Sequence, residues 1–270
     1  MGKSNDSDSL KNLQIRHAIL RMIEQATGRI GAPSLGVVLP EGLRISQAAI
    51  GRILMQFDRE NLTVRSGYNG RRLTEKGRQH LDTLFQTILK AKRADAFLRS
   101  LDADTKGKLV QILVVRRALE NEAARLAASS ITDEELADLG LVLESQVSAL
   151  RANENCSAQD LLFHSLIARA SRNEVLFHSL NVLRYETYMS PYVSSIRHRI
   201  HGIVESDHVG ILEALRARQP EEAARCMNQH INRIIDDIER YWQSHTSQAQ
   251  TASPHESFDT TGTNQEGTAY

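Results

Sequence analysis

Helical spacing of apolar residues runs almost unbroken from Gln79 to about residue 240, and it constrains the fold more than any other feature. Apolar side chains that recur every three or four residues mark the buried face of an α-helix. The breaks are short, and four of them carry helix-start signals, at Asp104, Thr132, Ser157 and Pro220. This pattern predicts a helical bundle rather than an α/β enzyme.

The N-terminal part has a different order of elements. A helix is expected over residues 12–30, followed by a stretch rich in Gly and Pro, and then by a helix that Ser46 caps and that ends near Asn61. Two short strands around a turn at residues 67–70 and a helix that begins at Glu75 come next. Helix, loop, capped helix and hairpin in this order predict a winged helix-turn-helix, which binds DNA.

Six side chains in this part are candidates for DNA contacts. In the capped helix, Gln and Arg can read adenine and guanine edges, and a small residue lets the helix approach closely. Arginines on or beside the hairpin would meet phosphates. The candidates are Gln47, Ala48, Arg52, Arg65, Arg71 and Arg72. The alternative is that these are ordinary solvated residues on a small α/β domain.

The charge distribution favours the DNA-binding interpretation. Residues 1–100 hold 17 Lys and Arg against 9 Asp and Glu, whereas the rest of the chain holds 16 against 24. A basic part joined to an acidic part suggests that the first part meets a polyanion and that the second does something else. We therefore expect double-stranded operator DNA as a partner.

Composition argues against a membrane protein and against a disulfide framework. The chain has no apolar run of about eighteen residues, and its first residues, MGKSNDSDSLKN, lack the hydrophobic stretch of a signal peptide. Its two cysteines, Cys156 and Cys226, form no CxxC motif and suit a reducing compartment. A cytoplasmic protein without a membrane partner is the expectation.

An acidic residue and three histidines interrupt the apolar faces of predicted helices. Asp160 and His164 lie one helical turn apart among apolar neighbours, and His208 and His230 lie on two later helices. One carboxylate and three imidazoles from three helices would suit a divalent ion such as Zn²⁺, Ni²⁺ or Mn²⁺. Spacing alone leaves open that these are hydrogen-bonded core residues without a metal.

Six short motifs follow one another between residues 105 and 240. They are RRALE (116–120), DLLFH (160–164), ASRN (170–173), HVGILEAL (208–215), RQPEEAA (218–224) and MNQHI (227–231). In this order and spacing they resemble the FadR-type C-terminal domain (FCD) of GntR-family transcription regulators. The resemblance implies an all-α bundle that binds small organic acids, often beside a divalent metal. Its metal ligands would be Asp160, His164, His208 and His230.

The resemblance also implies an effector pocket. The family's pocket arginine corresponds to Arg116, and a guanidinium beside a metal ion is a strong receptor for a carboxylate. Asn173 and Arg197 are further candidate effector-binding residues. The alternatives are that Arg116 pairs with a structural acid, that Asn173 caps the following helix, and that Arg197 lies on the surface. A small carboxylate is the expected effector.

The N-terminal part departs from the usual GntR pattern. Recognition helices of the family resemble S-R-x-P-V-R-E-A-L, whereas residues 46–54 read SQAAIGRIL. Together with NGRRLTEKG at residues 69–77, they are more similar to the winged helices of NrpR-type regulators, whose wing ends in G-R-x-x-T-x-x-G. This departure puts in doubt a transfer of GntR operator preferences, but not the DNA-binding role.

The expected architecture is mainly α. A winged helix-turn-helix domain covers residues 1–85, a helical linker 86–104, an FCD-like all-α ligand-binding domain 105–244, and a disordered tail 245–270. A homodimer is expected because palindromic operators need two readers related by symmetry.

These expectations together predict a ligand-responsive transcription regulator rather than an enzyme. One rival is a metal-dependent hydrolase, but an HD-type phosphohydrolase needs adjacent His-Asp, and this chain has Asp207-His208 in the reverse order with no obvious general base. The other rival is a helical interaction module without metal.

Overall fold

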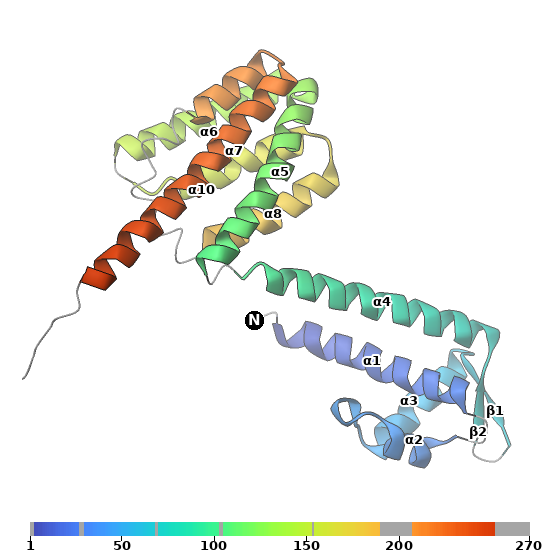
Figure 1. The fold of residues 1–270 in the computed structure, drawn as a ribbon. Helices are drawn as coiled ribbons and strands as arrows, with labels where there is room; N and C mark the ends of the chain where they lie inside the picture. The colour runs from blue at the N-terminus through green and yellow to red at the C-terminus, as the bar shows by residue number, and fades with distance from the viewer. Residues whose placement is uncertain are drawn as a thin grey trace, which may run out of the picture. The chain divides into compact units, whose positions relative to one another are not determined.

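The chain divides into two compact units, Met1–Ser100 and Leu101–Tyr270. The computed structural model, drawn in Figure 1, describes residues 3–26, 30–67, 70–102, 105–152, 154–189 and 207–251. Each unit has its own apolar core. Within the described ranges, no helix is both long and apolar enough to cross a membrane.

The first unit is a winged helix-turn-helix, as predicted. Its elements are α1 (Lys3–Gln25), α2 (Ala32–Val38), the 3-10 helix η1 (Glu41–Leu43), α3 (Gln47–Arg59), β1 (Thr63–Ser66), β2 (Gly70–Leu73) and α4 (Glu75–Ser100). The strands pair antiparallel, with Thr63 opposite Leu73 and Ser66 opposite Gly70. Ser46 caps α3, because its hydroxyl accepts a hydrogen bond from the Ala49 N–H. The core of this unit includes Ile19, Leu20, Ile50, Leu54 and Phe57.

The hairpin is held tightly against the start of α4. A Cβ atom at Gly77 would lie 2.0 Å from the carbonyl oxygen of Leu62, so the close approach requires glycine. The same carbonyl accepts a hydrogen bond from the Thr74 N–H. The Thr74 hydroxyl donates to the Asn61 carbonyl and accepts from the Gly77 N–H. These contacts fix the hairpin relative to α4.

The second unit is all α in the residues described, as predicted. Its elements are α5 (Lys106–Ser130), α6 (Asp133–Arg151), α7 (Ser157–Ala170), α8 (Glu174–Met189), the helical residues 207–216, and α10 (Pro220–Thr251). Helix α10 packs along α5, and α7 packs against α5, α6 and α8 (Figure 1). The core between them includes Leu139, Phe163, Ile167, Leu215 and Ile231.

Helix-start signals explain where these helices begin. Thr132 and Glu135 form a capping box at the start of α6, in which each side chain accepts from the other residue's backbone N–H. Thr105 caps α5 with a hydrogen bond from the Lys108 N–H. Asp104, which the sequence suggested for this start, lies outside the described residues.

Two segments differ from the expected domain plan. The part of the predicted linker up to residue 100 continues α4, and the division between the units falls after Ser100. Residues 245–251 of the predicted disordered tail belong to α10. Neither Gly nor Pro occurs between Pro220 and Thr251, so nothing in the sequence interrupts this helix. The remainder of the predicted tail, residues 252–270, lies outside the described residues.

Candidate metal centre

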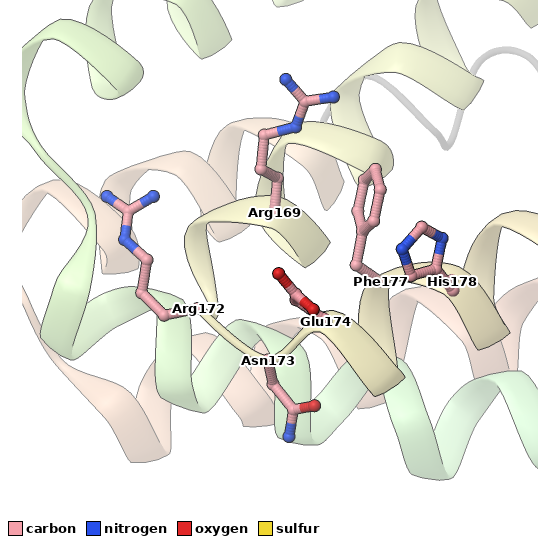
Figure 2. Close-up of a pocket in the computed structure, with 6 residues that line it drawn as sticks. All are labelled: Arg169, Arg172, Asn173, Glu174, Phe177 and His178. Atoms are coloured by element: carbon pink, nitrogen blue, oxygen red, sulfur yellow. The ribbon is translucent and has the colours of Figure 1, made fainter.

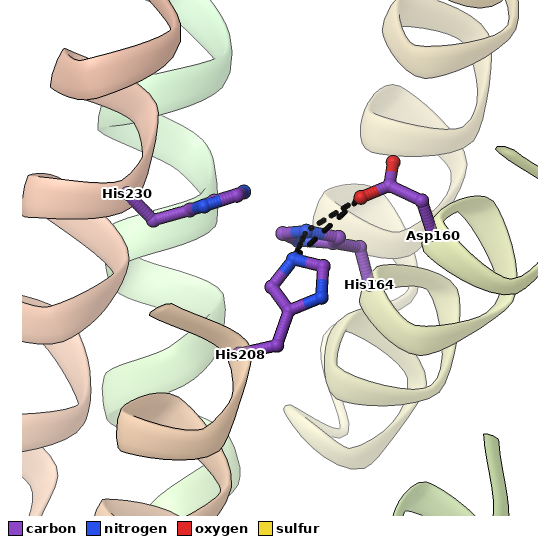
Figure 3. A group of neighbouring side chains, drawn as sticks. All are labelled: Asp160, His164, His208 and His230. Atoms are coloured by element: carbon purple, nitrogen blue, oxygen red, sulfur yellow. Dashed lines mark hydrogen bonds and ion pairs between the residues drawn. The ribbon is translucent and has the colours of Figure 1, made fainter. Parts of the chain in front are cut away.

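The four predicted metal ligands come together inside the second unit (Figure 3). One ligand atom from each of Asp160, His164, His208 and His230 lies within 4.8 Å of the others. Asp160 and His164 lie one turn apart on α7, and the other two come from residues 207–216 and α10. The amphipathic pattern that buries these three helices therefore also brings the four polar side chains together.

The three imidazoles are almost completely buried. His164, His208 and His230 are 3%, 0% and 1% exposed. The ring of Phe163 stacks on the ring of His208, with their centroids 4.6 Å apart. Three polar rings inside an apolar core need partners.

Several of the proposed ligand atoms lie close to one another. His164 Nε2 and His208 Nε2 lie 3.1 Å apart, and Asp160 Oδ1 lies 3.7 Å and 3.6 Å from these two atoms. His230 Nε2 is buried without a hydrogen-bond partner among the described residues. A divalent cation among these atoms would satisfy them all, so the residues fit such an ion.

The protonation states also suit metal binding. Burial lowers the pKa of His164 and of His230 to about 4, and burial together with the other two histidines lowers the pKa of His208 well below its usual range. Burial acts to raise the pKa of Asp160, but His164 and Arg184 outweigh it and hold that pKa low. At neutral pH the cluster offers neutral imidazoles and one carboxylate, the forms that ligate metals.

Comparison with known proteins identifies the unit that carries this cluster. Residues 111–233 match the family model described as the FCD domain. This match shows that the chain contains an FCD domain. Residues 17–81 match the model described as the ribonuclease R winged-helix domain. A winged helix is thus found where the sequence predicted one, and its similarity to the NrpR type stays a prediction.

Curated relatives match about half of this chain. The NanR transcriptional repressor of Cronobacter sakazakii is 27% identical over 134 residues, which are 48% of this chain and 50% of that protein. The Uxu operon regulator of Haemophilus influenzae is 26% identical over 129 residues, 46% of this chain and 48% of that protein. The chain therefore spans about half the length of these relatives.

Solved structures of similar proteins include Streptococcus agalactiae GntR and Escherichia coli McbR/YncC. The first is 21% identical with a TM-score of 0.45, and the alignment covers 85% of this chain and 98% of that one. The second is 17% identical with a TM-score of 0.47, covering 87% and 97%.

A buried carboxylate of the FCD domain, Glu120 on α5, links the cluster to two arginines. Glu120 Oε1 lies 2.8 Å from Arg116 Nε, and Glu120 Oε2 lies 2.5 Å from Arg184 Nη2 and 2.7 Å from His164 Nδ1. Burial acts to raise the pKa of Glu120, but Arg184 and Arg116 outweigh it and hold that pKa well below its usual range. Arg184 Nη1 also lies 3.4 Å from Asp160 Oδ2, so the second carboxylate oxygen faces a guanidinium.

Two of the predicted effector-binding residues make contacts within the protein. Arg116 is 5% exposed and paired with Glu120, which is the alternative that the sequence left open. Asn173 is exposed and caps α8, because its Oδ1 accepts from the Leu176 N–H at 3.1 Å. Figure 2 shows Asn173 among the residues that line a surface pocket of about 400 Å³ on α7 and α8. Arg197 lies outside the described residues.

Sequence reasoning missed the residues behind the histidines. Gln146 on α6 is fully buried, and its Oε1 lies 2.7 Å from His208 Nδ1. Asp207 is buried beside His230, with Oδ2 3.4 Å from Nδ1, and is also paired with Arg233. The available signal was an amide on the apolar face of α6, but no spacing rule shows which histidine it meets.

In the winged helix, the predicted DNA-contacting residues divide into two groups. Five are exposed: Gln47, Ala48, Arg52, Arg65 and Arg72. The sixth, Arg71, has a side chain only 12% exposed, and its guanidinium binds both oxygens of Asp58, at 3.1 and 2.9 Å. This ion pair engages the Arg71 guanidinium on α3, and a DNA contact by Arg71 stays a prediction.

Proposed function

We propose that the chain is a ligand-responsive, DNA-binding transcription regulator and not an enzyme. The carrying observation is the buried cluster of one aspartate and three histidines in an FCD domain, on a chain that also has a winged helix with exposed arginines. The names of the NanR repressor and the Uxu operon regulator support this proposal.

The sensing part of the proposal rests on a divalent ion, with Zn²⁺, Ni²⁺ and Mn²⁺ as the candidates. Asp160, His164, His208 and His230 would hold it. When bound, such an ion supplies open coordination positions and positive charge for a small carboxylate effector. Arg184 and Glu120 hold Asp160 and His164 in place, and the apolar core around the rings excludes water.

The regulatory part requires two copies of the chain. Palindromic operators present two half-sites, so a homodimer would place one winged helix on each. Gln47 and Arg52 on α3 would reach base edges, and Arg65 and Arg72 on the hairpin would contact phosphates. An effector alters operator affinity when it favours one of two dimer geometries, since the coupling equals its difference in affinity for them.

Operator binding with and without effector tests the function. DNA selected from a random library serves as the probe, and a panel of mono-, di- and tricarboxylates is added after the purified protein has been reconstituted with Zn²⁺, Ni²⁺ or Mn²⁺. We expect at least one acid to change the apparent DNA affinity by about 5–150-fold, the usual range of allosteric coupling. If no acid and no metal alters binding, the sensor function is wrong.

Elemental analysis of protein purified without an affinity tag separates the regulator from its rivals. Metal occupancy that is lost in the His208→Ala, His230→Ala double variant supports the site. Protein that holds no ion in any preparation would favour the metal-free interaction module. Turnover of phosphoesters by the purified protein would favour the hydrolase.

A further inference from the structure

Two of the proposed ligand histidines meet an oxygen from another helix at their Nδ1 atoms. Gln146 Oε1 lies 2.7 Å from His208 Nδ1, and Glu120 Oε2 lies 2.7 Å from His164 Nδ1. An oxygen acceptor at this distance needs a proton on Nδ1. The His208 contact is a hydrogen bond, and a neutral imidazole carries a single N–H, so the His208 ring has a bare lone pair on Nε2.

This bare nitrogen lies close to the other proposed ligand atoms. His164 Nε2 and His208 Nε2 lie 3.1 Å apart, and Asp160 Oδ1 lies within 3.7 Å of both. Figure 3 shows the rings of His164 and His208 converging there beside Asp160. The hydrogen bond at Nδ1 thus decides which nitrogen of His208 faces the cluster.

Packing does not explain an amide at position 146. Gln146 is 0% exposed, and other buried residues of α6 include Leu139, Leu143 and Ala149. A helix that only packs would carry an apolar residue here, because a buried amide gives up its bonds to water. The contact of its side-chain oxygen with His208 replaces one of these bonds to water.

We propose that Gln146 is a positioning residue of the metal centre, whose side-chain oxygen holds the His208 ring so that Nε2 faces the ion. This inference rests on the metal site proposed above. Glu120 lies at a similar distance from His164 but is also the partner of Arg116 and Arg184. A change at Glu120 would combine lost positioning with lost charge, whereas a change at Gln146 isolates the positioning.

The test compares Gln146→Leu, which removes the acceptor at similar volume, with Gln146→Glu, which keeps an acceptor and removes the amide donor. Thr187→Val is the matched control, since Thr187 is also buried and its hydroxyl donates to the Leu183 carbonyl of its own helix. Zn²⁺ and Ni²⁺ affinities of the full chain are measured by competition with a chelator. Nitrogen-15 NMR of the metal-free proteins reports the histidine tautomers.

We expect Gln146→Leu to bind both ions about 10–100-fold more weakly, the usual effect of removing such a partner. His208 should then change from a single Nδ1-protonated form to a mixture of tautomers. Gln146→Glu should retain the affinity, and Thr187→Val should match the wild type in affinity and in tautomer.

Two results would overturn the inference. Wild-type affinity and an unchanged tautomer in Gln146→Leu, with binding lost in His208→Ala, would remove the role of Gln146 and leave the metal site standing. If the wild-type chain binds neither ion, both the metal site and the positioning role of Gln146 are wrong. If circular dichroism shows Gln146→Leu to be unfolded, Gln146→Glu decides: retained affinity supports an acceptor role, and lost affinity in a folded protein contradicts it.

Discussion

The two units of the chain use their charged residues in opposite ways. The winged helix keeps Arg52, Arg65 and Arg72 exposed, where a polyanion can reach them. The FCD domain buries Arg116 and Arg184 around Glu120, so these charges are committed to one another. An exposed charge adds little to stability and is free to bind a partner, whereas a buried charge fixes the geometry of its neighbours and is harmful when unpaired.

The largest expected effect comes from breaking the buried pairs. Glu120→Leu leaves buried Arg116 without its acidic partner and Arg184 with only its longer contact to Asp160, which should lower the free energy of unfolding of the FCD domain by about 3–5 kcal/mol. The single tryptophan, Trp242, packs with Leu109 and Leu113, so its fluorescence during urea unfolding reports this unit. Glu122→Leu, which removes the half-exposed partner of Arg125 in the same unit, is the control and should change stability by less than about 1 kcal/mol. Equal effects of the two changes would contradict the comparison.

A steric change in the winged helix should lower the stability of this unit alone. Gly77→Ala places a Cβ against the Leu62 carbonyl and should destabilise the winged helix by about 1–3 kcal/mol, the usual range for overpacking. Gly51 on α3 has open space around its Cβ position, so Gly51→Ala should be neutral or stabilising by up to about 1 kcal/mol. Urea unfolding followed by circular dichroism measures both, while Trp242 fluorescence should stay unchanged. A destabilised Trp242 transition would show that the units do not unfold separately.

Arg71 and Arg72 allow the exposed and the paired arginine to be compared within one strand, β2. Arg72→Ala should weaken operator binding and reduce the slope of log affinity against log salt by about 1, as expected for one lost phosphate contact. Its stability should change by less than about 0.5 kcal/mol. Arg71→Ala should instead lower the stability of the unit, because Asp58 loses the guanidinium that binds both of its oxygens. Fluorescence anisotropy over a salt series, with urea unfolding beside it, separates the two. If Arg71→Ala reduces the salt slope and Arg72→Ala does not, Arg71 rather than Arg72 contacts a phosphate.

The smallest expected effect is a pH dependence at Asp58. Burial acts to raise the pKa of Asp58, but hydrogen bonds from Arg71 and Thr63 outweigh it and lower that pKa below 3.8. The unfolded state therefore takes up the proton at higher pH than the folded state, so the stabilisation is present above about pH 4 and is lost as the pH falls through the folded pKa. The stability difference between wild type and Asp58→Asn, taken from urea midpoints between pH 3 and 7, should shrink toward low pH. A difference that grows toward low pH would contradict the ion pair.

Local signals predicted most of the fold. Ser46 and Thr132 marked helix starts that the structure shows, and the hairpin glycines and apolar spacing placed the winged helix. Such features depend on neighbours within a few residues, which is why they can be read along the chain. The metal-ligand candidates came from one helical spacing and a family resemblance.

The contacts that set the chemistry lie far apart in the sequence. Arg71 meets Asp58 only because the hairpin folds back on α3, and Gln146 meets His208 across 62 residues. The sequence left two roles open for Asn173 and for Arg116. The structure shows the cap and the pair with Glu120, and their effector binding stays a prediction.

By itself, the sequence determined that the chain has a basic winged helix followed by an all-α unit, and that Asp160 shares one helix face with His164. Helical periodicity and capping act over short distances, so they fix these points without knowledge of the rest of the fold. The tertiary structure decided which charged side chains are exposed and which are buried in ion pairs. Those relations depend on which helices pack together, because burial and partnership are set by distance in space.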